Sequence, residues 1–438
     1  MWVYILLLVC VINIIFTNKD DRKVSNPSIC FSLLWTFIVW LSSLRWLSLH
    51  KTADREYFLI CIGTIFFVVG SQLSKLFRDK NFVTQTNYEN EYNFRYRLLC
   101  ILAIGCILFY FPDFVKSIIA MLSGVSLNDV RSSVQESEYS TGLANLIPNY
   151  IILPVAIALE PLAIIDFWFG KRNKPFIGLV LVLVMVRALG DGGRTPVFNM
   201  VLYFIVANII LNQIKKKEEP KNLEIKEEIK AAKDKKMFKK ISVAGVALLG
   251  VLTFMRAANT IFRKLYFYFA MSPVLFSRWN EYMEPAHYRG YGLVSFNGIF
   301  YFFDYIRKNF FGSDYVESII EAYNAVALTD SQWMKIAPTT TANAYVSCFW
   351  FFYTDGGVIG VILLSLLYGF VMGRCYDRMK KKKDICTLAL FLLLYQGVFF
   401  SFIRFPFAKA YYVIAIVIVL YVAFEKTMRR RNNDRAFD

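Results

Sequence analysis

Between two apolar runs, residues 174–189 and 197–211, the chain reads Arg187-Ala-Leu-Gly-Asp-Gly-Gly-Arg-Thr-Pro196. Each run is about long enough to cross a bilayer, whose hydrocarbon core takes about 20 apolar residues in a helix. A charged residue at membrane depth is costly, so its presence there indicates a functional site. The stretch therefore predicts two membrane-spanning helices joined by a charged turn that carries function.

The turn has the residues of an anion-binding corner. Gly192 and Gly193 allow positive φ, so the backbone can turn its N–H groups to one side. The Thr-Pro pair that follows supplies a good helix N-cap and a good first helical residue. The positive end of a helix dipole and a guanidinium fork both favour phosphate. We therefore predict that Arg194 binds phosphate with Gly192, Gly193 and Thr195, and that Arg187 contributes to the same site.

The composition of the whole chain is that of a polytopic membrane protein. Of its 438 residues, 57% are hydrophobic and 17% aromatic, and the mean hydropathy is +0.44, values outside the soluble range. The formal charge of +17 does not indicate nucleic-acid binding, because the basic residues cluster in short links between apolar runs, where they orient helices. Eight cysteines without a Cys-x-x-Cys pair, and only two histidines, predict no disulfide framework, no metal site and no cofactor.

The apolar runs predict an all-helical fold with about eleven transmembrane helices. The runs are residues 2–16, 28–47, 57–74, 98–119, 148–169, 175–189, 197–212, 241–255, 355–373, 385–402 and 409–425. Basic residues predict the orientation, with the N-terminus outside and the C-terminus in the cytoplasm. On this topology 33 of the 50 Lys and Arg fall in the cytoplasmic links, which are residues 17–27, 75–97, 171–174, 213–240, 374–384 and the tail from 426.

Two longer links divide the chain. The loop 213–240 is rich in Lys and Glu, which is typical of a solvated cytoplasmic segment. The outer segment 256–345 is too long for a structureless loop, and its Ser272-Pro273 helix-start signal predicts short helices on the outer membrane face. We therefore expect three parts: transmembrane helices 1–8 in 1–255, an external helical loop in 256–345, and helices 9–11 with a basic tail in 346–438.

Arginines are the most evident polar residues of the predicted outer side. Arginine keeps its charge and matches phosphate oxygens in a fixed fork, which suits a lipid-linked phosphate or pyrophosphate. Arg131, in the outer segment 123–147, and Arg404, in the last outer turn, are therefore further candidates. The alternative stays open that these arginines reach lipid head groups or pair with acids such as Asp191.

A pyrophosphate is already a good leaving group, so transfer from it needs charge stabilisation and a base for the incoming hydroxyl. Our candidate bases on the outer side are His287, Asp355 and Glu281, with Glu284 and Asp304 as further carboxylates. Two simpler interpretations are kept beside these. A lone loop histidine is usually a surface residue, and Asp355 suits the N-cap of the next apolar run.

Five short motifs follow one another along the chain. They are Gly-Gly-Arg-Thr-Pro196, Leu265-Tyr-Phe-Tyr-Phe-Ala270 through Pro273 to Tyr282, Gly290-Tyr-Gly292, Asn343-Ala-Tyr345 and Phe352-Tyr-Thr-Asp-Gly-Gly-Val-Ile-Gly360. In this order they resemble the Wzy-type repeat-unit polymerases of O-antigen and capsular polysaccharide synthesis. The family often has a glycine after the aromatic run, where this chain has Ala270-Met-Ser272.

The resemblance implies a GT-C-like membrane glycosyltransferase in the bacterial plasma membrane. Such an enzyme moves a growing glycan from its undecaprenyl pyrophosphate carrier onto the next lipid-linked repeat unit, outside the membrane and without a nucleotide sugar. The implied partners are the undecaprenyl-pyrophosphate-linked oligosaccharide, membrane lipids and a chain-length regulator protein. The resemblance implies that Arg194, and less directly Arg131 and Arg404, correspond to the outer-face arginines of the family.

Two other functions stay open. An O-antigen ligase uses the same kind of donor and passes the glycan to a lipid or protein acceptor, and nothing in the sequence separates it from a polymerase. A lipid-linked oligosaccharide flippase or another transporter would need two similar sets of helices, broken near the middle of the membrane. The sequence shows no such repeat, and its polar residues gather outside the spans.

Overall fold

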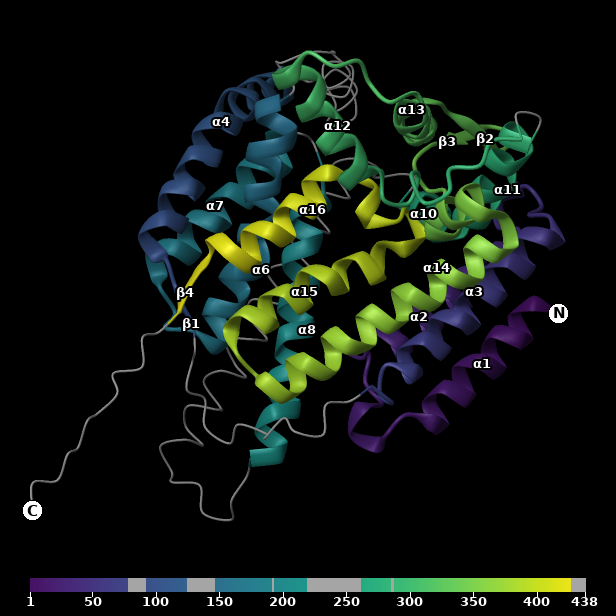
Figure 1. The fold of residues 1–438 in the computed structure, drawn as a ribbon, viewed down its shortest axis with the longest axis horizontal. Helices are drawn as coiled ribbons and strands as arrows, with labels where there is room; N and C mark the ends of the chain where they lie inside the picture. The colour runs from purple at the N-terminus through teal and green to yellow at the C-terminus, as the bar shows by residue number, and fades with distance from the viewer. Residues whose placement is uncertain (78–91, 124–145, 191–192, 219–260, 285–286, 427–438) are drawn as a thin grey trace, which may run out of the picture.

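The computed structural model describes residues 1–77, 92–123, 146–190, 193–218, 261–284 and 287–426 (Figure 1). Over these ranges the chain is almost entirely helical, with two short antiparallel strand pairs. Seven of the helices described are long and apolar enough to cross a membrane. The predicted all-helical, multi-pass character is therefore confirmed at this level, and the number of eleven spans stays a prediction.

These seven helices fall where the sequence places apolar runs. They are α2 (Pro27–Leu44), α3 (Asp54–Leu73), α4 (Tyr96–Leu122), α6 (Leu153–Phe169) with the π-helical turn η4 (Pro148–Ile152) before it, α8 (Thr195–Glu218), α14 (Ser347–Lys382), and α15 (Ile385–Phe399) with η6 (Phe400–Phe402) after it. The remaining apolar helices are α1 (Trp2–Phe16), α7 (Lys174–Gly190), and α16 (Ala410–Val417) with η8 (Ile418–Val422). The expected run 241–255 lies outside the described residues, as does most of the loop 213–240.

Two packing centres hold the bundle together. In one, α3 and α14 lie side by side (Figure 1), so close that a Cβ on Gly70 would lie 2.0 Å from the Leu366 carbonyl oxygen and one on Gly369 would lie 2.0 Å from that of Phe67. Small residues permit such close helix packing where lipid supplies no hydrophobic force. In the other, α6 is largely buried and contacts α4, α7, α8, α15 and α16.

Helix α14 is longer than the apolar run that predicted it. It begins at Ser347 and bends at Gly356 and Gly357, whose φ/ψ values of −151°/21° and 61°/−143° are not helical. A glycine pair is a usual site for a kink in a helix. Because α14 begins at Ser347, Asp355 lies inside the helix, directly before the bend.

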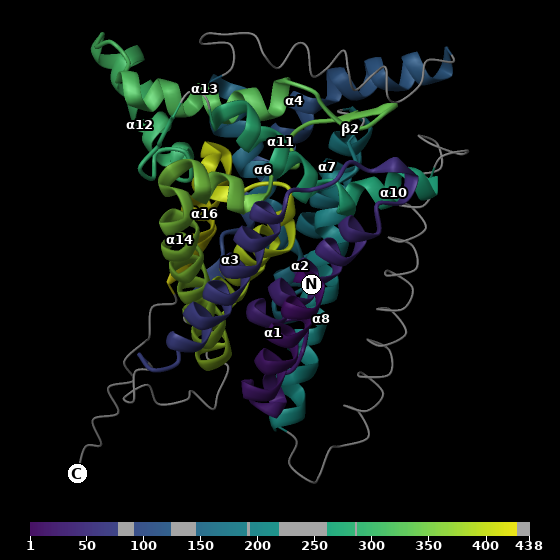
Figure 2. The ribbon, with the colours of Figure 1, turned by 90° about the vertical axis from the view of Figure 1, so that its right-hand side faces the viewer.

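Residues 261–346, which we call the lid segment, cross one end of the bundle (Figure 2). They form α10 (Ile261–Ala270), α11 (Ser272–Met283), α12 (Asn297–Phe311), α13 (Glu317–Ser331) and a hairpin of β2 (Met334–Ala337) and β3 (Thr340–Ala342). The predicted short helices are therefore present, whereas the hairpin was not expected. We call this end of the bundle the lid end. The opposite end, where α14 turns into α15 and β1 (Tyr92–Phe94) pairs with β4 (Phe424–Lys426), is the turn end.

Candidate functional site

The link between α7 and α8 meets the link between α15 and α16 at the lid end. Phe198, in the first turn of α8, packs against Phe399 and Phe400 at the end of α15, with ring centroids 5.7 and 5.5 Å apart. The segment that follows contains Arg404 and Lys409. Two cationic links that are about 200 residues apart in sequence are thus brought together under the lid segment.

Arg194 is the residue before the first residue of α8. The Phe198 N–H donates to its carbonyl oxygen at 3.0 Å, which is the geometry of an N-cap residue. Its half-buried guanidinium lies 5.9 Å from the centroid of the Tyr268 ring on α10. That ring packs edge-on against Tyr345, which in turn contacts Phe402.

The predicted anion-binding corner is therefore described only in part. Gly193 is partly buried and Thr195 is exposed at the start of α8. Gly192 and Asp191 lie outside the described residues, and so does Arg131. What the structure describes is a helix N-terminus with a guanidinium beside an aromatic wall of Tyr268 and Tyr345.

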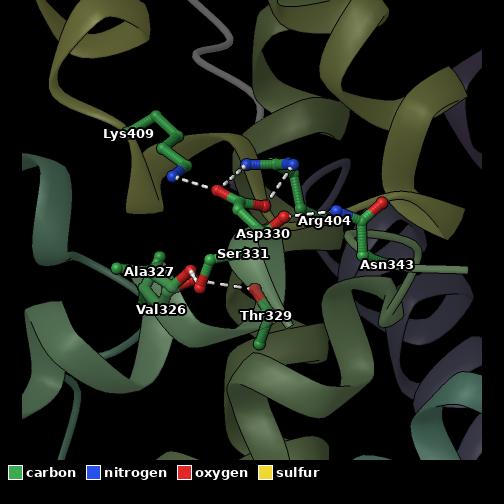
Figure 3. A network of polar contacts seen from close by, with 8 residues as sticks. All are labelled: Val326, Ala327, Thr329, Asp330, Ser331, Asn343, Arg404 and Lys409. Atoms are coloured by element: carbon green, nitrogen blue, oxygen red, sulfur yellow. Dashed lines mark hydrogen bonds and ion pairs between the residues drawn. The ribbon is translucent and has the colours of Figure 1, made fainter. Parts of the chain in front are cut away.

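Arg404 is held by an acid of the lid segment (Figure 3). Its Nη1 and Nη2 donate to the two carboxylate oxygens of Asp330 on α13, at 2.9 and 2.7 Å, and Lys409 Nζ lies 2.6 Å from Oδ2. The amide of Asn343 donates to the Asp330 carbonyl oxygen. Burial raises the pKa of this carboxyl, but Arg404 and Lys409 outweigh that effect, so the net pKa falls from 3.8 to about 2.

This pairing bears on the prediction that Arg404 binds pyrophosphate. Both terminal nitrogens of the guanidinium already face a carboxylate in a bidentate pair, the strongest arrangement for this group. A phosphate would have to compete with Asp330 for the fork. The contact also joins α13 of the lid segment to the α15–α16 link, so Arg404 has a structural task in any case.

Arg187 lies deeper in the bundle than Arg194. Its side chain is 8% exposed and forms an ion pair of 2.8 Å with Glu160 of α6, whose side chain is fully buried. Asn199 of α8 donates to the other Glu160 oxygen at 3.1 Å, and Gln396 of α15 lies 3.3 Å from Asn199. The network thus connects α6, α7, α8 and α15. It holds the α7–α8 link in place, and it occupies the Arg187 guanidinium with a buried acid.

Asp355 receives hydrogen bonds from a distant turn rather than from its own helix. The backbone N–H groups of Val294 and Ser295 donate to its two carboxylate oxygens at 3.0 and 2.8 Å. The Gly290 N–H donates to the Thr354 carbonyl oxygen at 3.1 Å. A Cβ on Gly290 would lie 2.5 Å from Asp355 Oδ1, so a larger residue there would push this turn away.

The other two candidate bases lie at the surface of the lid end. Glu281 forms an exposed ion pair of 3.0 Å with Arg278, which also lies 3.2 Å from His50 Nδ1. His287 is exposed and has a positive φ of 47°. Its neighbour Tyr288 is half-buried, and burial, with Asp355 and Glu321 nearby, raises its pKa to about 12.

Two residues of this region, Arg55 and Asp330, were not predicted from the sequence. Arg55 lies over the ring of Tyr353 at 5.7 Å and pairs with Glu284 at 2.9 Å. Arg289, one of the arginines of the predicted outer segment, lies over the same ring at 5.5 Å. Arg55 and Asp330 have no local signal, because their contacts join segments far apart in sequence.

The Asp355 turn and the Arg404 cluster are neighbours. Phe296, at the end of that turn, packs against Phe405 with ring centroids 5.9 Å apart. The lid end thus combines guanidinium groups, a helix N-terminus and tyrosine rings within one layer. Such an arrangement can bind an anion and stack on sugar rings. Among the described residues no group of three or more His, Cys, Asp and Glu side chains is placed to hold a metal ion.

No family model matches the chain, and neither the curated proteins nor the solved structures include a match.

Proposed function

We propose that the protein polymerises lipid-linked oligosaccharide repeat units, transferring the growing glycan from undecaprenyl pyrophosphate to the next lipid-linked unit. The observation that carries the proposal is the position of Arg194. It lies at the N-terminus of an apolar helix, beside Tyr268 and Tyr345 of the lid segment. A pyrophosphate at the membrane surface, with sugars extending from it, needs a cation and aromatic rings in this arrangement.

The proposed reaction exchanges one bond at the anomeric carbon of the donor. The bond from that carbon to the pyrophosphate oxygen breaks, and a bond from the same carbon to the acceptor hydroxyl oxygen forms. The hydroxyl proton passes to a base, and the carrier pyrophosphate leaves with the electron pair. Arg194 and the helix dipole of α8 stabilise the charge that develops on the leaving oxygen.

We propose His287 as the base. Asp355 accepts two backbone hydrogen bonds and Glu281 pairs with Arg278, so both carboxylates have structural tasks. The imidazole ring offers a nitrogen that can accept the hydroxyl proton in the transition state.

Two of the predicted ligands become positioning residues in this proposal. Arg187 fixes the α7–α8 link through Glu160, and Arg404 fixes the lid segment through Asp330. We also propose the remaining sequence-based features: eleven spans in a GT-C-like arrangement, the lid end outside the bacterial plasma membrane, the N-terminus outside and the C-terminus in the cytoplasm. A chain-length regulator protein and membrane lipids are the expected partners.

The test compares surface glycan on gels from a deletion strain that carries the normal gene or a variant. We expect Arg194→Ala to abolish polymer, and Arg194→Lys to restore it in part, because a point charge lacks the bidentate fork. Arg278→Ala, which removes an exposed lid-end arginine, is the matched control and retains the full ladder. Membrane levels of each variant, measured by immunoblot, exclude a loss of protein.

The glycan of the deletion strain separates the alternatives. A single lipid-anchored repeat unit supports polymerisation. Full-length polymer that stays on its carrier indicates a ligase, and an unchanged ladder rules out both transfer reactions. If Arg194→Ala gives polymer of normal length, the assignment of this arginine is wrong.

A further inference from the structure

A cavity of about 490 Å³ opens at the turn end, away from the residues of the proposed reaction. Its lining residues come from the last turns of α14, the start of α15, η8 and β1. Its wall combines basic, acidic and apolar side chains. Those used below are Arg374, Arg378, Lys381, Lys382, Leu420 and Tyr421.

The basic side chains come from one face of one helix. Arg374, Arg378 and Lys381 are spaced four and three residues apart, which places them on the same side of α14. The next residue, Lys382, also lines the cavity. Lys380 belongs to the other side, where it pairs with Asp21. The face therefore concentrates four positive charges on the cavity.

The acids in the wall offset this charge only in part. Asp384 is the N-cap of α15, and its Oδ1 accepts the Thr387 N–H at 2.8 Å. Its Oδ2 lies 3.0 Å from Thr387 Oγ1. Four basic and two acidic side chains line the cavity, so its lining favours an anion.

The opposite wall is apolar and open. Leu420 and Tyr421 are 37% and 74% exposed, although they border a strongly basic surface. Basic residues that only offset the dipole at the end of α14 would not need an apolar wall beside them. A cavity with a cationic half and an apolar half fits a ligand that is itself anionic at one end and apolar at the other.

We propose that this cavity binds an anionic phospholipid. Its phosphodiester lies against Arg378, Lys381 and Lys382, and the upper part of an acyl chain lies along Leu420 and Tyr421. The cavity is found where the apolar helices α14 and α15 end, which is the depth of a lipid headgroup. Basic pockets between membrane helices bind such headgroups, with about 1 kcal/mol for each Lys or Arg near an anionic surface. The inference does not depend on the proposed reaction.

The test uses the full chain, purified in a neutral detergent and freed of lipid. Thermal unfolding is followed by tryptophan fluorescence while dioctanoyl phosphatidylglycerol, dioctanoyl phosphatidylcholine or inorganic phosphate is added. The cavity variant is Arg378→Gln/Lys381→Gln. The matched control is Lys171→Gln/Lys174→Gln, which removes an exposed lysine of the α6–α7 link and the exposed first residue of α7 at the same end.

We expect phosphatidylglycerol to raise the unfolding midpoint of the normal protein and of the control, and the other two additives to leave it unchanged. The cavity variant should need about thirtyfold more phosphatidylglycerol for the same shift, because it lacks two cationic contacts of about 1 kcal/mol each. Arg378→Lys/Lys381→Arg, which keeps both charges, should behave as the normal protein. Tyr421→Ser should weaken the shift without harming the fold, since this side chain is mostly exposed.

Three results would overturn the proposal. If inorganic phosphate gives the same shift, the cavity is a site for a free anion. If phosphatidylcholine raises the unfolding midpoint as much as phosphatidylglycerol does, the charge of the headgroup is not recognised. If the control variant loses the shift as fully as the cavity variant, the attraction belongs to the whole basic surface and not to this cavity.

Discussion

The carboxylate of Asp330 joins the lid segment to the bundle, so its removal should loosen the lid segment. Two cations, Arg404 and Lys409, converge on this group, and all three side chains are about one fifth exposed. Asp330→Asn keeps the size and one acceptor oxygen but removes the charge. We expect this variant to be less stable at neutral pH, mainly because two cations then face an uncharged amide.

The shifted pKa gives the size of the effect. The pKa of Asp330 falls from 3.8 to about 2 on folding, and one pKa unit corresponds to about 1.4 kcal/mol, so the charged form contributes about 2 kcal/mol. Because the folded pKa is the lower one, this contribution is complete above pH 4 and disappears as the pH falls through about 2. Loss of one partner from a buried ion pair costs about 3–5 kcal/mol in other proteins, and the partial exposure here argues for the lower part of that range.

The assay is urea unfolding in detergent at a series of pH values, with hydrogen exchange of residues 317–346 to detect local opening. Asp314→Asn is the matched control, because this exposed carboxylate also lies in the lid segment and has no ion pair among those the structure describes. We expect Asp330→Asn to lose stability at pH 7 relative to the control. The difference should shrink between pH 4 and pH 2 as the normal protein becomes protonated.

Two results would refute this reasoning. One is an equal stability of both variants at pH 7, which would show that the convergence of charges on Asp330 contributes nothing net. The other is a difference that persists unchanged to pH 2, which would show that the loss comes from packing and not from the charge.

Two further substitutions test contacts elsewhere. Arg187→Met should destabilise the protein by about 3–5 kcal/mol, because it leaves the fully buried Glu160 without its cation. The double variant Arg187→Met/Glu160→Gln should recover most of this stability in the same unfolding assay. If it recovers none, the pairing of the two residues is contradicted. Gly290→Ala should cost about 1–3 kcal/mol, because the new Cβ would lie 2.5 Å from Asp355 Oδ1. Gly105→Ala is its control, since a Cβ there meets nothing within 4 Å, and equal stabilities of the two alanine variants would show that the Asp355 turn adjusts freely.

Features that depend on neighbouring residues were predicted well from the sequence. The apolar runs found in the described residues are helices, and the Thr-Pro pair marks the start of α8 within one residue, because helix length and caps follow local chemistry. The same reasoning placed Asp355 as the cap of its own helix, whereas its carboxylate caps a turn about 60 residues away. An acidic residue carries no local mark of the distant N–H groups that it will meet.

The arginines show this limit most clearly, and a double variant can separate their possible roles. The sequence makes Arg187, Arg194 and Arg404 candidates for a pyrophosphate, with Arg194 first, and the fold gives Arg187 and Arg404 an acidic partner each. Loss of activity in Arg404→Met alone would therefore not identify a ligand. The double variant Arg404→Met/Asp330→Leu removes both charges of the bidentate pair and leaves only Lys409 without this carboxylate, so it should regain part of the stability if Arg404 serves the lid segment. If polymer returns with stability, Arg404 is a positioning residue. If the double variant is stable and still makes no polymer, Arg404 contacts the substrate and our assignment of the pair is wrong.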